Sequence, residues 1–282
     1  MSHEQGARLR LAFSPCPNDT FIFEALVHGR ISLPGFFPEA VLEDVETLNQ
    51  RAFKGLYPIT KLSFAALGRL RQNYALLPCG AALGRGCGPL LAGRTMLTPE
   101  ELRRVVIAVP GMDTTAAFLL RYFLGQDIKL RPMAFETIMP ALQDGRAEAG
   151  VIIHEGRFVF EEYGLICMQD LGLFWEESSG LPIPLGGIAL RRDMLSLAPA
   201  LSRAIRESIL HARQFPELVM PYIRTHAQEM AREVIDRHIG LYVNDFSLNL
   251  GEEGRAAVAF FFRMGESMGL FPPFAGDYMA PV

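Results

Sequence analysis

His154 is the residue whose type and position point most directly to chemistry. It follows the apolar run at residues 150–153, which is typical of a parallel strand buried on both faces. Ligands of open α/β sheets bind outside the carboxyl ends of the strands, so we expect this imidazole at the ligand edge. Its ordinary pKa of about 6.5 leaves much of the ring neutral near pH 7 and able to accept a proton. We predict a general base at His154; the alternative is a histidine that only packs in the core.

The remaining histidines and the cysteines lack such a context. The cysteines form no C-x-x-C pair, and Cys79 and Cys87 do not have the spacing of zinc ligands. We therefore expect ordinary buried thiols and no metal or disulfide at Cys16, Cys79, Cys87 and Cys167. We expect solvated or packing roles for His3, His28, His211, His226 and His238.

Three polar turns share one design, in which a strand leads through a short turn into a helix. They lie at residues 14–20, 60–63 and 111–115. A helix N-terminus exposes unpaired N–H groups and a partial positive charge, which suit a carboxylate or phosphate. The turns predict a small anionic ligand, whereas the alternative is that they only cap helices. The candidate contacts are the Ser63, Thr114 and Thr115 hydroxyls, Lys61 with Leu62 beside it, and Asn18 and Asp19, which are also candidate helix caps.

A glycine-rich segment at residues 84–88 invites a nucleotide-binding interpretation, but the signal is weak. A dinucleotide loop must open a helix, and here Pro89 and an apolar run follow. The chain also lacks a G-x-x-x-x-G-K-[ST] motif, a G-x-S-x-G elbow and an H-E-x-x-H motif. We interpret the glycines as tight turns near a hinge.

The composition and charge of the chain exclude several classes of protein. The 282 residues include 27 basic and 31 acidic side chains, for a net charge of −4, and 50% are hydrophobic. Such a chain can bury a sizeable core and is a poor nucleic-acid binder. No stretch approaches the roughly 20 apolar residues of a membrane span, and the polar N-terminal ten residues do not resemble a secretory signal. We expect a cytoplasmic protein that binds a small anionic molecule and has no nucleic acid or membrane partner. A homodimer is possible on this sequence.

The elements that must position these residues alternate between strand and helix, which predicts an α/β fold with largely parallel sheets. We expect two lobes around a ligand cleft, with the large lobe formed by residues 1–93 and 188–282 and the small inserted lobe by residues 94–187. The predicted strands lie at 8–14, 38–44, 58–60, 74–77, 89–92, 105–109, 130–134, 150–154 and 185–191. The predicted helices lie at 20–28, 45–53, 64–71, 116–124 and 136–143, and the pattern from residue 196 onward is helical.

Four motifs in this order resemble the 1,4-dihydroxy-6-naphthoate synthase family of the futalosine route to menaquinone. They are SPCPNDTF at residues 14–21, GAALGRGCGPL at 80–90, IIHEGR at 152–157 and LPIPLGG at 181–187. The resemblance spans about residues 9–270. It implies the two-lobed fold of type II periplasmic binding proteins.

The resemblance also implies an activity. Members of the family are lyases that convert cyclic de-hypoxanthinylfutalosine into 1,4-dihydroxy-6-naphthoate without a metal or organic cofactor. By similarity His154 is the base, and residues 61–63 and 114–115 contact the substrate, an aryl carboxylate. His154 is expected to remove a proton and start carbon–carbon cleavage. Two alternatives stay open: the sister enzyme chorismate dehydratase, and a solute-binding protein that needs no base.

Overall fold

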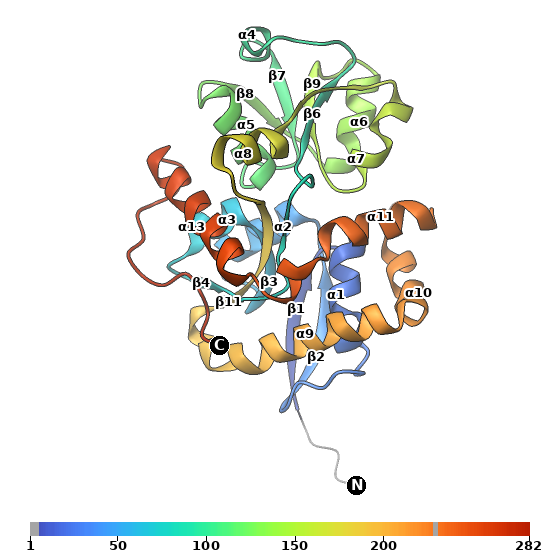
Figure 1. Cartoon of the computed structure of the whole chain (residues 1–282), viewed down its shortest axis with the longest axis vertical. Coiled ribbons are helices and arrows are strands. Elements are labelled where there is room, and N and C mark those ends of the chain that lie inside the picture. The colour runs from blue at the N-terminus through green and yellow to red at the C-terminus, as the bar shows by residue number, and fades with distance from the viewer. Residues whose placement is uncertain (1–5, 228–230) are drawn as a thin grey trace.

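The structure, a computed structural model, describes residues 6–227 and 231–282. Figure 1 shows two lobes, one above the other, each built around its own sheet. Both lobes combine strands with helices, and the chain passes between them twice, before strand β6 and into strand β11. The fold is therefore α/β and two-lobed, as the sequence predicts.

The lower lobe in Figure 1 contains a six-stranded mixed sheet. Its strand order is β2-β1-β3-β11-β4, and β5 also pairs with β11. Strand β1 is parallel to β2 and β3, whereas β11 is antiparallel to β3, β4 and β5. The strands are β1 (Ala7–Phe13), β2 (Phe36–Leu42), β3 (Ile59–Ser63), β4 (Tyr74–Leu76), β5 (Ala82–Gly84) and β11 (Ile183–Arg191).

The upper lobe contains a five-stranded sheet of order β10-β6-β9-β7-β8. Strand β7 is parallel to β8 and β9, and β6 is antiparallel to β9 and β10. The strands are β6 (Leu90–Gly93), β7 (Val106–Val109), β8 (Lys129–Pro132), β9 (Ala149–Ile152) and β10 (Ile166–Asp170).

Helices cover both sheets. In the lower lobe they are α1 (Pro17–Val27), α2 (Val45–Phe53), α3 (Phe64–Leu70), α9 (Ala198–Gln214), α10 (Pro216–His226), α11 (Arg232–Tyr242), α12 (Asp245–Leu248) and α13 (Gly251–Ser267), with the 3₁₀ segment η2 (Arg192–Leu197). In the upper lobe they are α4 (Pro99–Leu102), α5 (Thr115–Leu124), α6 (Phe135–Gln143), α7 (Gly156–Val159) and α8 (Leu171–Ser179), with η1 (Phe160–Tyr163). Within the described residues, none of these helices is both long and apolar enough to span a bilayer.

An apolar core joins the two lobes. Phe261 of α13 packs against Phe118 of α5 with ring centroids 4.2 Å apart, and against Phe64 of α3 at 6.3 Å. All three rings are fully or almost fully buried in one cluster that also includes Trp175 of α8. Aromatic rings of this size dominate core energetics, so this contact stabilises the two lobes against each other.

Local sequence signals account for several elements. Helix α2 covers residues 45–53 as predicted, because Asp44 Oδ1 accepts hydrogen bonds from the N–H groups of Glu46 and Thr47. Helix α4 begins with a capping box, in which Thr98 and Glu101 bond each other's backbone N–H groups.

The start of α1 differs from the prediction. The helix begins at Pro17 with Cys16 as the N-cap residue, so the expectation that Asn18 or Asp19 caps a helix from Thr20 is wrong. Proline suits the first helical turn because its missing N–H group has no partner there in any case. The Asp19 carboxylate is left free for partners outside the helix.

Other segments were not predicted from the sequence. The short strand β5 precedes the glycine-rich segment and shares only Gly84 with it, and α7, β10 and α8 occupy residues 156–179, to which no element was assigned. Sheet membership also differs from the predicted lobe boundaries. Strand β6 pairs within the upper sheet although it precedes residue 94, and β11 runs through the predicted boundary at residues 187–188.

Candidate active site

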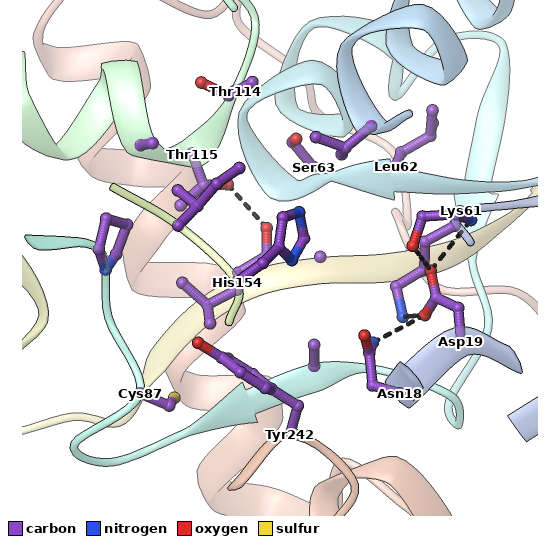
Figure 2. Close-up of a pocket in the computed structure, with 18 residues that line it drawn as sticks. Asn18, Asp19, Lys61, Leu62, Ser63, Cys87, Thr114, Thr115, His154 and Tyr242 are labelled. Carbon is purple, nitrogen blue, oxygen red and sulfur yellow. Dashed lines mark hydrogen bonds and ion pairs between the residues drawn. The ribbon is translucent and has the colours of Figure 1, made fainter. Parts of the chain in front are cut away.

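A pocket between the lobes collects the residues that the sequence analysis selected. Its walls come from the ends of β1, β3 and β9, from the starts of α1 and α5, and from β11. Figure 2 shows these side chains around one space. All eight predicted residues line it: Asn18, Asp19, Lys61, Leu62, Ser63, Thr114, Thr115 and His154.

Asp19 and Lys61 form a buried ion pair in the pocket wall (Figure 2). Lys61 Nζ lies 2.7 Å from Asp19 Oδ1 and also donates to the Gly80 carbonyl at 3.1 Å. The Asp19 carboxylate accepts further hydrogen bonds from the Ser14 hydroxyl at 2.8 Å and the Asn18 amide at 2.9 Å. Lys61 is expected from the sequence to contact a ligand, and this stays a prediction. In the structure its charge is buried and paired with Asp19, while one of its three N–H donors has no partner among the described residues.

The three predicted hydroxyl donors differ in whether their hydrogen already has an acceptor within the protein. Thr114 Oγ1 donates to the Gly111 carbonyl at 2.8 Å, and Thr115 Oγ1 donates to the Leu185 carbonyl at 2.8 Å. A threonine hydroxyl has one hydrogen, so both hydroxyls donate to the backbone here, and donation to a ligand stays a prediction that requires each hydroxyl to exchange its acceptor. Ser63 Oγ accepts from the Asn49 amide at 3.1 Å and has no acceptor for its own hydrogen among the described residues. Ser63 therefore remains a free donor at the pocket.

Thr114 still shapes the site through the backbone. Its side chain caps α5 by accepting from Ala117 N–H at 3.2 Å. The preceding N–H groups, of Thr115 and Ala116, find no acceptor within the described residues. Together with Ser63 they leave three hydrogen-bond donors on one side of the pocket, which suits an anionic ligand group.

His154 lies two residues beyond β9, on the turn toward α7. Its φ of 55° makes it the one non-glycine residue with positive φ in the described part of the chain. Such a conformation is uncommon and is found at functional sites, where surrounding structure maintains it. The ring packs edge-on against Phe135 with centroids 5.2 Å apart.

The surroundings of His154 favour the neutral base. Removal from water lowers the pKa of the His154 imidazole, and the neighbouring Lys61 charge acts in the same direction, while Glu155 and Asp19 partly oppose it. Neither ring nitrogen has a hydrogen-bond partner among the described residues. A lone pair is therefore available toward the pocket at neutral pH.

The sequence analysis missed two residues behind His154. His238 of α11 is fully buried, and its ring is stacked with that of His154 at a centroid distance of 6.2 Å. Its Nε2 contacts Asn18 Oδ1 at 3.0 Å, and its Nδ1 lies 3.7 Å from Oε2 of Glu155. Glu155 could have been noticed as the neighbour of His154, but no local signal marks His238. Its place depends on the packing of α11 against α1.

One cluster in the described residues has the ligand types and spacing for a metal ion. Atoms of Cys16, His154 and Glu155 lie within 4.8 Å of one another. Burial and the Glu155 charge raise the pKa of the Cys16 thiol well above its usual value. The thiolate is the form that binds metals, so without a metal ion this thiol stays protonated.

Contacts between the lobes close one side of the pocket. Asp113, in the turn before α5, pairs with Arg69 of α3 and accepts from the Gln50 amide at 2.9 Å. Its carbonyl accepts from Asn49 of α2 at 3.3 Å. Asp113 is thus one of the residues that hold the upper lobe against α2 and α3.

Comparisons with known proteins agree with this geometry. A family model described as menaquinone biosynthesis matches residues 9–267. A Thermus thermophilus protein named 1,4-dihydroxy-6-naphthoate synthase is 50% identical over 266 residues, covering 94% of this chain and 96% of that protein. A Streptomyces coelicolor protein of the same name is 43% identical over 281 residues, covering 96% and 98%.

Solved structures support the fold. A protein from Archaeoglobus fulgidus superposes with a TM-score of 0.88 at 36% identity, covering 94% of this chain and 98% of that one. The alkanesulfonate-binding protein of Xanthomonas axonopodis gives a TM-score of 0.70 at 12% identity, with 95% of each chain covered. The latter likeness shows the fold alone, which is that of periplasmic binding proteins.

Proposed function

The chain belongs to the menaquinone-biosynthesis family of 1,4-dihydroxy-6-naphthoate synthases and is an enzyme, and from this premise we propose that its substrate is cyclic de-hypoxanthinylfutalosine. The product of the proposed reaction is 1,4-dihydroxy-6-naphthoate. The observation that carries the proposal is the neutral, unpaired imidazole of His154 at the pocket, opposite a group of free donors.

In the proposed reaction His154 is the general base. Its free ring nitrogen takes a proton from the spirocyclic substrate, and carbon–carbon cleavage follows. Formation of the aromatic naphthoate supplies driving force. A positioned base typically contributes about 10²- to 10⁴-fold to the rate. The lowered pKa keeps the imidazole in its accepting form at neutral pH, which supports this role.

The substrate carboxylate lies, in this proposal, between Ser63 and the start of α5. The Ser63 hydroxyl and the Thr115 and Ala116 N–H groups supply donors there, and the partial positive charge of the helix end favours an anion. The buried Lys61 has two of its three N–H donors engaged, so one remains for a neutral or anionic substrate oxygen.

Closure of the lobes excludes water from the reaction. The contacts of Asp113 with α2 and α3 bring the α5 turn and Ser63 to the same side of the pocket. Water-free closure aligns the reacting groups and protects intermediates. We propose that the closed arrangement is the one in which proton transfer takes place.

The direct test is turnover of purified cyclic de-hypoxanthinylfutalosine, with product followed by mass spectrometry. Appearance of 1,4-dihydroxy-6-naphthoate supports the proposal. Turnover of chorismate instead would assign the sister activity, and tight binding of the cyclic compound without turnover would indicate a binding protein. By the family resemblance the reaction needs no metal or organic cofactor, so dialysis against a chelator should leave the rate unchanged. We propose that the enzyme works in the cytoplasm.

A further inference from the structure

Two buried polar atoms behind His154 face each other without a hydrogen bond. Glu155 Oε2 and His238 Nδ1 are both closed off from water, and neither has a partner within hydrogen-bond distance among the described residues. They lie 3.7 Å apart, so each is a polar neighbour of the other. Glu155 is 8% exposed and His238 is fully buried. Buried polar atoms without partners are rare, and each needs an explanation.

The hydrogen-bond network determines the tautomer of His238. Asp19 is held as an acceptor by Lys61 and Ser14, so the Asn18 group that contacts Asp19 at 2.9 Å must be its NH₂. The Asn18 oxygen then points at His238 Nε2, 3.0 Å away. Because that oxygen only accepts, Nε2 carries a hydrogen.

With this tautomer, a lone pair of His238 Nδ1 faces a lone pair of Glu155 Oε2, and both atoms are closed off from water. A neutral imidazole has one N–H group, so Nδ1 of neutral His238 is bare toward Glu155. An ionised Glu155 carboxylate is also only an acceptor. Burying these two acceptors without a hydrogen-bond donor costs free energy. One proton between Glu155 Oε2 and His238 Nδ1 gives both atoms a hydrogen bond.

We propose that Glu155 Oε2 and His238 Nδ1 share one proton, and that this pair is a positioning unit that keeps His154 in its neutral, accepting form. With the shared proton the pair has no net charge. A carboxylate oxygen of Glu155 lies within 4.8 Å of a ring nitrogen of His154, and the His238 ring is stacked on His154. A bare negative charge would favour the imidazolium of His154, and an added positive charge would repel it. The role in catalysis rests on the proposed function, but the shared proton does not.

Other ionisable groups interact with the pair or with its neighbours. Cys16, His154 and Tyr242 interact directly with Glu155 or His238. Asp19, Lys61 and Arg157 interact in turn with one or more of these three groups. The variants below leave all of them in place.

The shared proton can be measured without turnover. We would label the histidines with ¹⁵N in the full-length protein and record the His238 ring nitrogens by NMR at neutral pH. We expect Nδ1 to be protonated or to accept a hydrogen bond, and to lose that signature in Glu155→Met. A resonance typical of a bare lone pair, unchanged in Glu155→Met, would overturn the proposal even if the enzyme is active.

The catalytic role is tested by comparing two Glu155 variants. In Glu155→Gln the amide can still donate to Nδ1, so we expect kcat/KM within about threefold of wild type at neutral pH. Glu155→Met leaves Nδ1 without a donor, and we expect a loss of at least about tenfold.

Equal losses in Glu155→Gln and Glu155→Met would contradict the proposal, because they would mean that a carboxylate charge is required. Glu162→Gln, on the exposed side of η1, is the matched control and should not alter the pH profile. Thermal unfolding of each variant identifies any loss of fold. If the wild-type protein does not convert the cyclic substrate, the proposed function is wrong. The NMR result still shows whether Glu155 and His238 share a proton.

Discussion

The ammonium group of Lys61 lies 2.7 Å from Oδ1 of Asp19, and both side chains are almost completely excluded from water. The pair connects the middle of β3 to the first turn of α1, and both residues lie in one wall of the pocket (Figure 2). Its charges cancel before any substrate arrives. The positive potential for an anionic substrate must therefore come chiefly from Ser63 and the start of α5.

Lys61→Met should destabilise the protein strongly, because it leaves the Asp19 carboxylate buried without its cation. Breaking a buried pair on one side typically costs about 3–5 kcal/mol. Urea unfolding of wild type and Lys61→Met measures the difference. Adding Asp19→Asn to Lys61→Met should recover part of the loss, because it removes the stranded charge. A loss below about 1 kcal/mol in the single variant would show that the pair contributes little.

The acid side of the pH profile should report His154. Burial lowers the pKa of its imidazole from the ordinary value of about 6.5. Protonation blocks a base, so kcat/KM should be retained at neutral pH and should fall only as pH drops below about 6.5. The pH dependence of kcat/KM reports the free enzyme, which is the state of this structure. An acid midpoint above the ordinary histidine value would contradict the lowered pKa.

Ser63→Ala should weaken substrate binding more than it slows the chemical step. A hydrogen bond to a charged group is worth about 1.5–3 kcal/mol, so KM should rise by roughly tenfold or more with kcat little changed. Steady-state kinetics on the cyclic substrate separate the two constants. Ser267→Ala, which removes an exposed hydroxyl on α13, is the matched control. An unchanged KM would remove Ser63 from the binding site.

Asp113→Asn should loosen the closed arrangement, because it weakens the pairing with Arg69 while keeping the size of the side chain. We expect a higher KM and a larger radius of gyration in small-angle X-ray scattering. Asp127→Asn changes an exposed aspartate in the same lobe and controls for net charge. Identical scattering and kinetics in the Asp113 and Asp127 variants would show that Asp113 does not hold the lobes together.

The parts of the fold that depend on local signals could be predicted from the sequence. Helix α2 has an N-cap at Asp44, the α4 turn has its capping box, and His154 follows an apolar strand. Strand β5 was not predicted because its three residues are too few to show an alternating pattern.

The electrostatics of the site depend on contacts between distant segments, which local patterns do not encode. Nothing around Lys61 indicates that Asp19 would neutralise it, and nothing around His238 indicates that α11 would bring it to Asn18. The Thr115 hydroxyl was expected to meet a ligand, and its backbone acceptor, Leu185, becomes its neighbour only in the folded chain.

The most direct test of the central claim is turnover of cyclic de-hypoxanthinylfutalosine by His154→Asn. Asparagine tolerates the positive φ of this position and so preserves the turn, but it cannot act as a base. With a thermal unfolding midpoint close to that of wild type, we predict that kcat falls by about 10²- to 10⁴-fold. A His154→Asn enzyme that forms 1,4-dihydroxy-6-naphthoate within about threefold of the wild-type rate would contradict the assignment of His154 as the base.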